Sequence, residues 1–191
     1  AEPLYKKSLK IFKITYGTEN PDVATIINNL GLLYSKQGRF AEAEDFFKRS
    51  LAIKEKILDP KHPDVALTLN NLGFLYIGQG NFTEAETKLQ RSLKIYKATF
   101  GPEHPNVAMS LGNLGVVYNN QSRFAEAGLL YKKSLKINEK VFGREHPKVA
   151  LSLNNLANHY IFKANYAEAE PLLQRSLKIY EIAYGPEHPE V

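Results

Sequence analysis

Pairs of asparagine recur in this 191-residue sequence where the surrounding apolar residues have helical spacing. TIINNLGLLY begins at residue 25, TLNNLGFLY at residue 68 and SLNNLANHY at residue 152, while SLGNLGVVY at residue 110 keeps one of the two asparagines. Asparagine is a weak helix former, so an interior helical asparagine needs another role. Its side-chain amide has one acceptor and two donors, which match the C=O and N–H of an extended peptide. The pairs therefore suggest peptide recognition.

Histidine and serine also recur at a fixed spacing. His62, His104, His146 and His188 are each one full repeat from the next, which keeps them from converging on one tetrahedral metal ion. Ser8, Ser50, Ser92, Ser134 and Ser176 follow the same step without a histidine base recurring beside them. The chain has no cysteine, so thiolate sites and disulfides are excluded. We expect no enzyme, no metal and no other cofactor.

A basic character raises nucleic acid as an alternative partner. The net charge is +5 and the sequence pI is about 9.2. The recurring basic residues are Lys7, Arg49, Arg91, Lys133 and Arg175, and then Lys10, Lys94, Lys136 and Lys178. Phosphate contacts dominate nucleic-acid binding, but this spacing also lets the basic side chains pair with glutamates. A solvated face is the favoured interpretation, and nucleic acid is a minor alternative.

The apolar residues are interrupted by polar ones along the whole chain. No apolar run approaches the roughly 18 residues that cross a bilayer, so we expect no membrane partner. The sequence opens on Ala1-Glu2-Pro3 without an initiator methionine, so a signal segment of a longer parent would lie outside it. A cytoplasmic location is the default expectation.

A fixed period of 42 organises the chain. It is followed by Pro21, Pro63, Pro105, Pro147 and Pro189, and by Tyr34, Tyr76, Tyr118 and Tyr160. We expect a single repeat segment over residues 1–191, with a half repeat at 1–20, full repeats at 21–62, 63–104, 105–146 and 147–188, and the start of a further repeat at 189–191.

Each repeat has the pattern of two helices, which we call helix A and helix B. In the second repeat, helix A starts at Pro63, where a first-turn proline is tolerated, and its apolar spacing runs until Gly80. Helix B starts at Phe82, and the loop FGPEH at residues 100–104 ends it. Repeated helical hairpins are therefore predicted.

These residues resemble the tetratricopeptide repeat signature over essentially the whole chain. The matching positions in the second repeat are Asn71, Leu72, Gly73, Tyr76, Gly80, Ala85, Leu89 and Ser92. The usual repeat has about 34 residues, and the longer period is similar to that of kinesin light chain. The resemblance implies an all-α, right-handed superhelical solenoid of antiparallel helix pairs. Ala157, Ser122, Ala164 and Asp59 replace glycines of the pattern, so we expect the third and fourth turns between helices A and B to differ.

A helical wheel gives helix A two faces. Val65, Ala66, Leu69, Leu72, Gly73 and Tyr76 fall on the side predicted to face the core. The opposite side mixes apolar residues with amides, and the resemblance implies that it lines a concave groove that binds peptide segments of partner proteins. The predicted peptide contacts are Asn28, Asn29, Leu32, Lys36, Leu67, Asn70, Asn71, Phe74, Met109, Asn113, Val116, Asn120, Leu151, Asn154, Asn155 and Asn158.

Two other interpretations stay open. The asparagines could bridge neighbouring helices without any ligand, since fold analogy alone does not establish function. The array could also be a structural spacer or a self-assembling scaffold within a longer repeat protein. Uncovered apolar faces at the ends of the repeats would then allow copies to associate.

Overall fold

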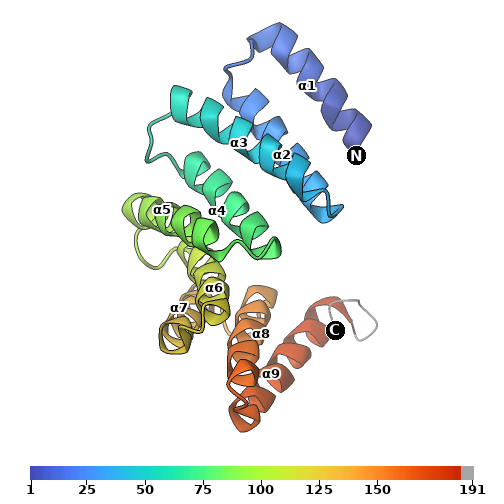
Figure 1. Cartoon of the computed structure of the whole chain (residues 1–191). Helices are drawn as coiled ribbons and strands as arrows, with labels where there is room; N and C mark the ends of the chain where they lie inside the picture. Colours follow the sequence, from blue (N-terminus) through green and yellow to red (C-terminus); the bar gives the residue numbers. More distant parts are fainter. Residues whose placement is uncertain (186–191) are drawn as a thin grey trace. The chain divides into compact units, whose positions relative to one another are not determined.

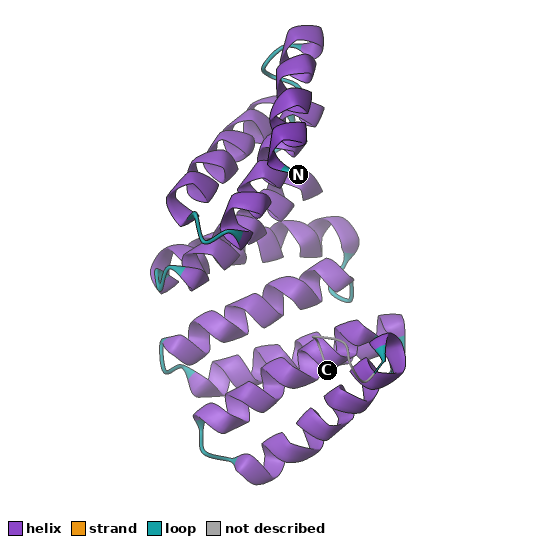
Figure 2. Ribbon diagram, turned by 90° about the vertical axis from the view of Figure 1, so that its right-hand side faces the viewer, coloured by secondary structure: helices purple, strands orange, loops and turns teal. Residues whose placement is uncertain are grey.

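The computed structural model describes residues 1–185, and within that range the chain is all-α, as predicted (Figures 1 and 2). The helices are α1 (Glu2–Tyr16), α2 (Pro21–Lys36), α3 (Phe40–Ile57), α4 (Pro63–Gly78), α5 (Phe82–Phe100), α6 (Pro105–Asn120), α7 (Phe124–Phe142), α8 (Pro147–Phe162) and α9 (Tyr166–Tyr184). His188 and the predicted start of a further repeat at 189–191 lie outside the described residues. None of the helices in residues 1–185 is long and apolar enough to cross a membrane.

The chain forms two compact units, residues 1–99 and residues 100–191. The first contains α1 to α5 and the second contains α6 to α9, with Phe100 as the boundary residue. Helix A of the predicted repeats corresponds to α2, α4, α6 and α8, and helix B to α1, α3, α5, α7 and α9. Successive helices within a unit run in opposite directions (Figure 1).

The linker histidines cap the A helices. In His62, His104 and His146 the ring Nδ1 accepts a hydrogen bond from the backbone N–H two residues later, at 3.1, 3.2 and 3.1 Å. Asn20 does the same for α2, since its Oδ1 accepts from the N–H of Asp22 at 2.8 Å. Each cap precedes a first-turn proline, which needs no N–H partner. These caps fix where every A helix begins.

Each hairpin is closed by a buried serine on helix B. The serine hydroxyl donates to the carbonyl of a fully buried alanine on helix A, at 2.7 to 3.0 Å in all four pairs. The pairs are Ser50 with Ala24, Ser92 with Ala66, Ser134 with Ala108 and Ser176 with Ala150. Helix A also needs a small residue where Leu89 packs, because a Cβ on Gly73 would lie 2.5 Å from the Leu89 side chain. The recurring serines are thus explained by close contact between the two helices of each hairpin.

The A helices are buried more widely than the wheel predicts. All six predicted core residues of α4 are buried, but so are Thr68, Asn70 and Leu75. Helix A is packed on more than one side, by its own helix B and by helix B of the preceding repeat, as Tyr76 shows by donating to Glu44 of α3 at 3.0 Å. The exposed stripe of each A helix is therefore narrower than half the helix.

Several polar contacts recur in every second repeat rather than in every repeat. The ion pairs Lys56 with Glu19 and Lys140 with Glu103 are two repeats apart, and so are Arg91 with Glu55 and Arg175 with Glu139. The guanidinium groups of Arg39 and Arg123 stack on Tyr34 and Tyr118 with the same step. The contacts therefore distinguish the odd hairpins, α2–α3 and α6–α7, from the even hairpins, α4–α5 and α8–α9. Each compact unit holds one hairpin of each kind.

Burial lowers the pKa of Lys54, and the nearby Asp64 carboxylate acts in the opposite direction. The ammonium has two acceptors in its buried site, Thr68 Oγ1 and the Asp64 carbonyl at 3.3 Å. The equivalent residues in the other helix B segments are aromatic or amide side chains, at Phe12, Tyr96, Asn138 and Tyr180. Lys54 is thus a variation of one repeat and not a feature of the array.

The predicted difference in the third and fourth turns is wrong. Ser122 and Ala164 have φ of 61° and 56°, close to the 74° and 73° of Gly38 and Gly80 at the same position. The hydrogen bonds also match, since the N–H after each of these residues donates to the carbonyl of the repeated tyrosine, from Tyr34 to Tyr160. The packing of the two helices holds a left-handed backbone conformation that serine and alanine disfavour.

Asp59 does change its loop. Helix α3 ends at Ile57, whereas α5 continues to Phe100, which stands one full repeat beyond Leu58. Gly101 and Gly143 follow their helices with φ of 82°, a conformation that an aspartate at residue 59 would adopt only with strain. The Asp59 carboxylate instead accepts from the N–H of Lys61 at 2.7 Å and forms an Asx turn.

We predict that Ala164→Gly stabilises the chain, because glycine relieves the strain of a positive φ at the α8–α9 turn. The gain should be about 0.5–1 kcal/mol after the larger unfolded-state entropy of glycine is subtracted. Urea unfolding followed by circular dichroism measures it. The reciprocal variant Gly80→Ala should lose a similar amount, and a loss of stability in Ala164→Gly would contradict the explanation.

Candidate functional site

The predicted site residues divide between the two units. In the first unit Leu32, Lys36, Leu67 and Phe74 are exposed, and Asn29 and Asn71 are partly exposed. In the second unit Met109, Asn120, Leu151 and Asn158 are exposed, and Asn113, Val116, Asn154 and Asn155 are partly exposed. Each unit thus carries its own exposed mixture of apolar and amide side chains on its A helices.

Two predicted site residues are not available to a ligand. Asn28 and Asn70 are only 3% and 4% exposed. The wheel places them on the outer stripe, but the packing of each A helix against more than one neighbour covers that edge of the stripe. Their placement as ligand contacts is therefore corrected to a place in the packed interior.

Asn28 bridges neighbouring A helices. Its Oδ1 accepts a hydrogen bond from Nδ2 of Asn71 on α4 at 3.1 Å. The first asparagine of one pair thus holds the second asparagine of the next repeat. In the first unit the paired asparagines therefore bridge neighbouring helices, which is the structural role that the sequence analysis kept as an alternative.

The second unit lacks this bridge because Gly112 stands where Asn28 and Asn70 stand in the earlier repeats. A Cβ on Gly112 would lie 3.7 Å from Nδ2 of Asn155, so the two helices approach as α2 and α4 do, but no acceptor is present. Within residues 1–185 the side chains of Asn154, Asn155 and Asn158 take part in no hydrogen bond. We call Leu151, Asn154, Asn155 and Asn158 the amide face of α8.

Apolar side chains flank the amide face of α8. Leu151 is 56% exposed at its start, and Ile161 and Phe162 are exposed at the end of the helix. No carboxylate lies on α8, and its only lysine, Lys148, is in the first turn. The face therefore offers amide donors and acceptors between apolar contacts, with little charge.

A buried histidine lies beneath this face, and the sequence analysis did not identify it. His159 Nδ1 is 2.8 Å from Oδ1 of Asn119, and because an amide oxygen only accepts, Nδ1 carries the proton. The Nε2 atom lies against Gly128, where a Cβ would be 2.9 Å away. The departure of these residues from the repeat could have identified the site in the sequence. His159 stands at the position of Leu33 and Leu75, and Gly128 stands at that of Glu44.

Burial lowers the pKa of His159, and repulsion from Lys163 and Lys132 adds to the effect. Tyr131 of α7 contacts the ring at 5.8 Å between centroids. A proton on Nε2 would point at Gly128, and no acceptor for it lies in residues 1–185. The neutral imidazole is therefore the form that fits the fold.

The basic residues of helix B are partly neutralised. The guanidinium of Arg49 donates to Asp45 at 3.2 Å, that of Arg91 contacts Glu55 at 2.5 Å, and that of Arg175 contacts Glu139 at 2.6 Å. These pairs support the interpretation of a solvated face at the arginine positions.

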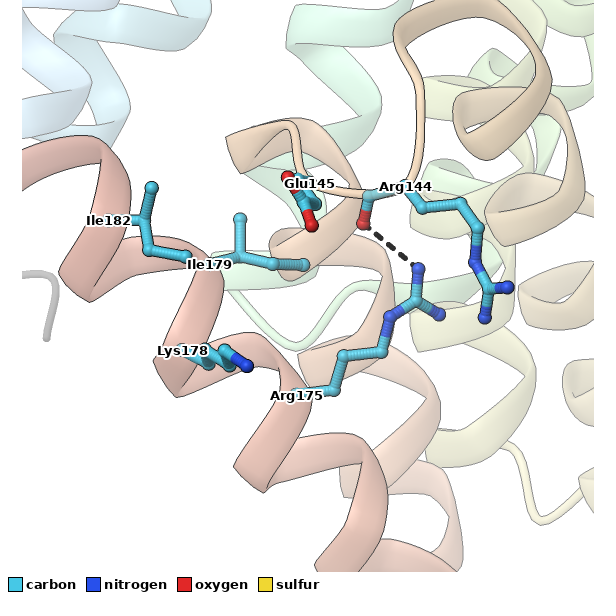
Figure 3. A pocket seen from close by; sticks show the side chains of 6 residues that line it. All are labelled: Arg144, Glu145, Arg175, Lys178, Ile179 and Ile182. Atoms are coloured by element: carbon cyan, nitrogen blue, oxygen red, sulfur yellow. Dashed lines mark hydrogen bonds between the residues drawn. The ribbon is translucent and has the colours of Figure 1, made fainter.

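A separate hollow of about 320 Å³ lies between α9 and the loop that precedes α8 (Figure 3). It is lined by Arg144, Glu145, Arg175, Lys178, Ile179 and Ile182. The Arg175 guanidinium is already engaged, since it donates to the Arg144 carbonyl at 2.9 Å and to Glu139 at 2.6 Å. The hollow thus belongs to the packing of α9 on that loop.

A family model described as tetratricopeptide repeat matches residues 1–56, 64–140, 111–182 and 149–191. A comparison with curated proteins found no match.

Solved structures resemble the chain over nearly its full length. BtubC (BKLC) from P. vanneervenii superposes with a TM-score of 0.80 and 26% identity, covering 99% of this chain and 75% of that chain. A putative kinesin light chain of Podosopora anserina with nearly identical TPR-like repeats gives a TM-score of 0.72 at 26% identity, covering 95% and 86%. A Rap protein in complex with Competence and Sporulation Factor has a TM-score of 0.74 at 16% identity, covering 83% and 43%, and shows the shared fold alone.

We predict that Gly112→Asn creates the missing bridge. The new Oδ1 would accept from Nδ2 of Asn155, and the new Cβ has room because its nearest neighbours are 3.6 and 3.7 Å away. A double-mutant cycle with Asn155→Ala, measured by urea unfolding, should give a coupling free energy of about 0.5–1.5 kcal/mol. Additive effects of the two changes would refute the geometry.

We predict that the second unit loses stability as the pH falls below about 6.5, the usual pKa of histidine. The folded-state pKa of His159 is lowered below that value, so the unfolded chain binds the proton first. The stabilising effect of neutral His159 is complete above the pKa that this histidine has in the unfolded chain, and it is lost as the pH falls to the lowered pKa in the folded chain. Between the two pKa values the free energy of unfolding falls by at most about 1.4 kcal/mol per pH unit. Denaturant unfolding over a pH series on both sides of that value measures it.

The double variant His159→Leu and Asn119→Ile is the control. It installs the residues found at Leu75 and Ile77 of the second repeat and removes the titrating group together with its partner. The difference in pH slope between this variant and the original chain isolates His159, and equal slopes would show that His159 does not contribute.

Proposed function

The chain belongs to the tetratricopeptide repeat family, and from that premise we propose that it is a non-catalytic module that binds a peptide segment of a partner protein on its A helices. Repeats of this family are generally protein–protein interaction scaffolds, and no enzyme family matches the chain. We propose that the ligand is a peptide and that it binds on the amide face of α8 and on the neighbouring residues of α6.

One observation carries the proposal. The side-chain amides of Asn155 and Asn158 have no partner within residues 1–185 and stand beside exposed Leu151. Polar groups with unused donors and acceptors next to exposed apolar surface are what an extended peptide requires. Each amide contact to a peptide backbone contributes about 0.5–1.5 kcal/mol.

The partner is expected to be an uncharged or weakly charged segment at this face. The amides would bind its C=O and N–H groups, while Leu151, Ile161 and Phe162 would contact its apolar side chains. In α6, exposed Met109 and partly exposed Asn113 and Val116 extend the same mixture. The equivalent surface in the first unit, on α2 and α4, offers Leu67 and Phe74 but uses one amide contact in the Asn28 bridge.

A second candidate function is that of an assembly element. Leu4, Ile11 and Ile14 of α1 are exposed, as are Leu173, Leu177 and Ile182 of α9. Exposed apolar rows on helices that elsewhere in the array are covered favour association between copies. Nucleic-acid binding through the basic faces has weaker support, because the arginines there are paired with acidic side chains.

The binding proposal is tested with a peptide selected on the intact chain by display. In the double variant Asn155→Ala and Asn158→Ala the affinity should fall about tenfold, because two amide contacts are removed. Fluorescence anisotropy with the labelled peptide measures the dissociation constant. Circular dichroism confirms that the variant is folded, which is expected since both side chains are at least partly exposed.

Matched controls lie on the B helices. Gln174→Ala removes an exposed amide from α9, and Leu129→Ala removes an exposed apolar side chain from α7. Both should leave the affinity unchanged. A peptide that binds equally well to the double variant and to the original chain would show that the amide face of α8 is not its site.

A further inference from the structure

One glutamate recurs near the start of helices α1, α3, α5 and α9. In each of these helices the side chain four residues later contacts its carboxylate. The pairs are Lys6 with Glu2 and Lys48 with Glu44 at 2.7 Å, Gln90 with Glu86 at 2.9 Å, and Gln174 with Glu170 at 3.1 Å. The carboxylate is therefore a regular hydrogen-bond acceptor of helix B.

The A helix that follows supplies a second donor to this carboxylate. The Tyr34 hydroxyl donates to Glu2 at 2.7 Å, and the Tyr76 hydroxyl donates to Glu44 at 3.0 Å. The pKa of Glu44 is lowered, chiefly by the hydrogen bond from its lysine partner and further by those from Tyr76 and Gln79, although burial acts in the opposite direction. The donors thus favour an ionised carboxylate at this place.

Helix α7 lacks the carboxylate, because Gly128 stands two full repeats beyond Glu44. The positions of the donors are still occupied by donors, with Lys132 on α7 and with Tyr160 and Lys163 where α8 ends. The lysine at residue 163 replaces a glutamine of the second repeat. The second unit has therefore lost a negative charge and gained a positive charge at the same place.

These donors have no acceptor within residues 1–185. The ammonium groups of Lys132 and Lys163 take part in no ion pair or hydrogen bond there, and the Tyr160 hydroxyl takes part in no hydrogen bond. Tyr160 is partly exposed, whereas Tyr34 and Tyr76 are only 2% and 5% exposed. The hydroxyl of Tyr160 is thus open to a ligand.

His159 fills part of the vacated space without supplying a negative charge. Its Nε2 lies 2.9 Å from the position of a Cβ on Gly128, and its ring is 5.6 Å from that of Tyr160 between centroids. After burial, repulsion from Lys163 and Lys132 is what lowers the pKa of this histidine, so both ammonium groups lie near the ring. The neutral ring leaves them without a counter-charge.

We propose that Lys132, Tyr160 and Lys163 form a binding site for a carboxylate from outside the chain, in the place that Gly128 leaves free. We call these four residues the carboxylate site. The Tyr160 hydroxyl donates to one carboxylate oxygen, and the two ammonium groups neutralise the charge. Hydrogen bonds to a charged acceptor are stronger than those between neutral groups. The site shares no residue with the amide face of α8, so it goes beyond the peptide binding proposed above.

The chemistry of the ligand follows from the first unit, where a lysine and a tyrosine in the same register bind a carboxylate. Lys132 and Lys163 are exposed, so the carboxylate site is open to solvent. Leu129 replaces Asp45 of the second repeat, which removes a second carboxylate that would repel an anion. Two sources can supply the same group, a small free carboxylate or an acidic side chain of another protein.

Acetate, which has the last two carbons of a glutamate side chain, is the probe for the site. In nuclear magnetic resonance spectra of the full chain, sodium acetate should shift the backbone amide signals of Gly128, Lys132 and Lys163, with half-saturation at about 10–100 mM. Sodium chloride at the same ionic strength should not shift them. Shifts that do not saturate, or that chloride reproduces, overturn the proposal.

Two capped tripeptides distinguish the sources of the carboxylate. One has glutamate between two glycines, and the other has glutamine there as its neutral equivalent. Shifts of the same signals by the glutamate peptide alone assign the site to an acidic side chain of a protein, whereas shifts by acetate and by neither peptide assign it to a small free carboxylate. Equal shifts by the two peptides would show that the charge is not recognised and would overturn the proposal.

Single variants test each donor. Lys132→Ala and Tyr160→Phe each remove one donor and should weaken acetate binding by about threefold or more. Lys133→Ala is the matched control, because it removes the same charge from the next exposed residue of α7 and should leave the binding unchanged. An equal loss in Lys132→Ala and Lys133→Ala would show that only the overall positive charge acts, and would overturn the site.

A variant that carries its own carboxylate tests the site in the opposite direction. The background is the double variant His159→Leu and Asn119→Ile, which gives Gly128 the neighbours that Glu44 has in the second repeat and removes the close contact with Nε2. This background should bind acetate. Adding Gly128→Glu should abolish the binding, because the new side chain occupies the site. Circular dichroism verifies that both variants are folded, and equal acetate binding by the two contradicts the proposal.

Discussion

The close approach of the two helices in each hairpin is the constraint on which the rest of this structure depends. A serine hydroxyl on helix B reaches a backbone carbonyl on helix A only because the facing residue is alanine and the contact is buried. The same approach excludes a Cβ from Gly73. Because this contact is equal in all four hairpins, variation elsewhere in the repeat leaves the hairpin intact.

The constancy of the hairpin explains why the sequence predicted so much of the fold. Periodicity located the helices, and the first-turn prolines and linker residues located their starts. The turns at Ser122 and Ala164 were mispredicted for the same reason that the fold is robust. Local preference disfavours a positive φ at these residues, but the packed helices on either side impose it.

The candidate site was less predictable, because exposure depends on neighbours that a single helical wheel does not include. Asn28 and Asn71 are both asparagines on the outer stripe of the wheel, yet Asn28 is buried and binds Asn71. Gly112 was visible as a break in the pattern, but its consequence for Asn155 follows only from the distance between the two helices. Gly112, Gly128 and His159 depart from the repeat and lie in the second unit, which gives that unit its own polar chemistry.

The alternation of odd and even hairpins has a consequence for how such an array can change in length. If residues 105–146 were removed from the gene, Arg175 would come to face the position of Lys97, a charge of the same sign. If residues 63–146 were removed, Arg175 would face Glu55 and the ion pair would be kept. Removal of these two hairpins thus keeps an ion pair that removal of the third repeat alone breaks.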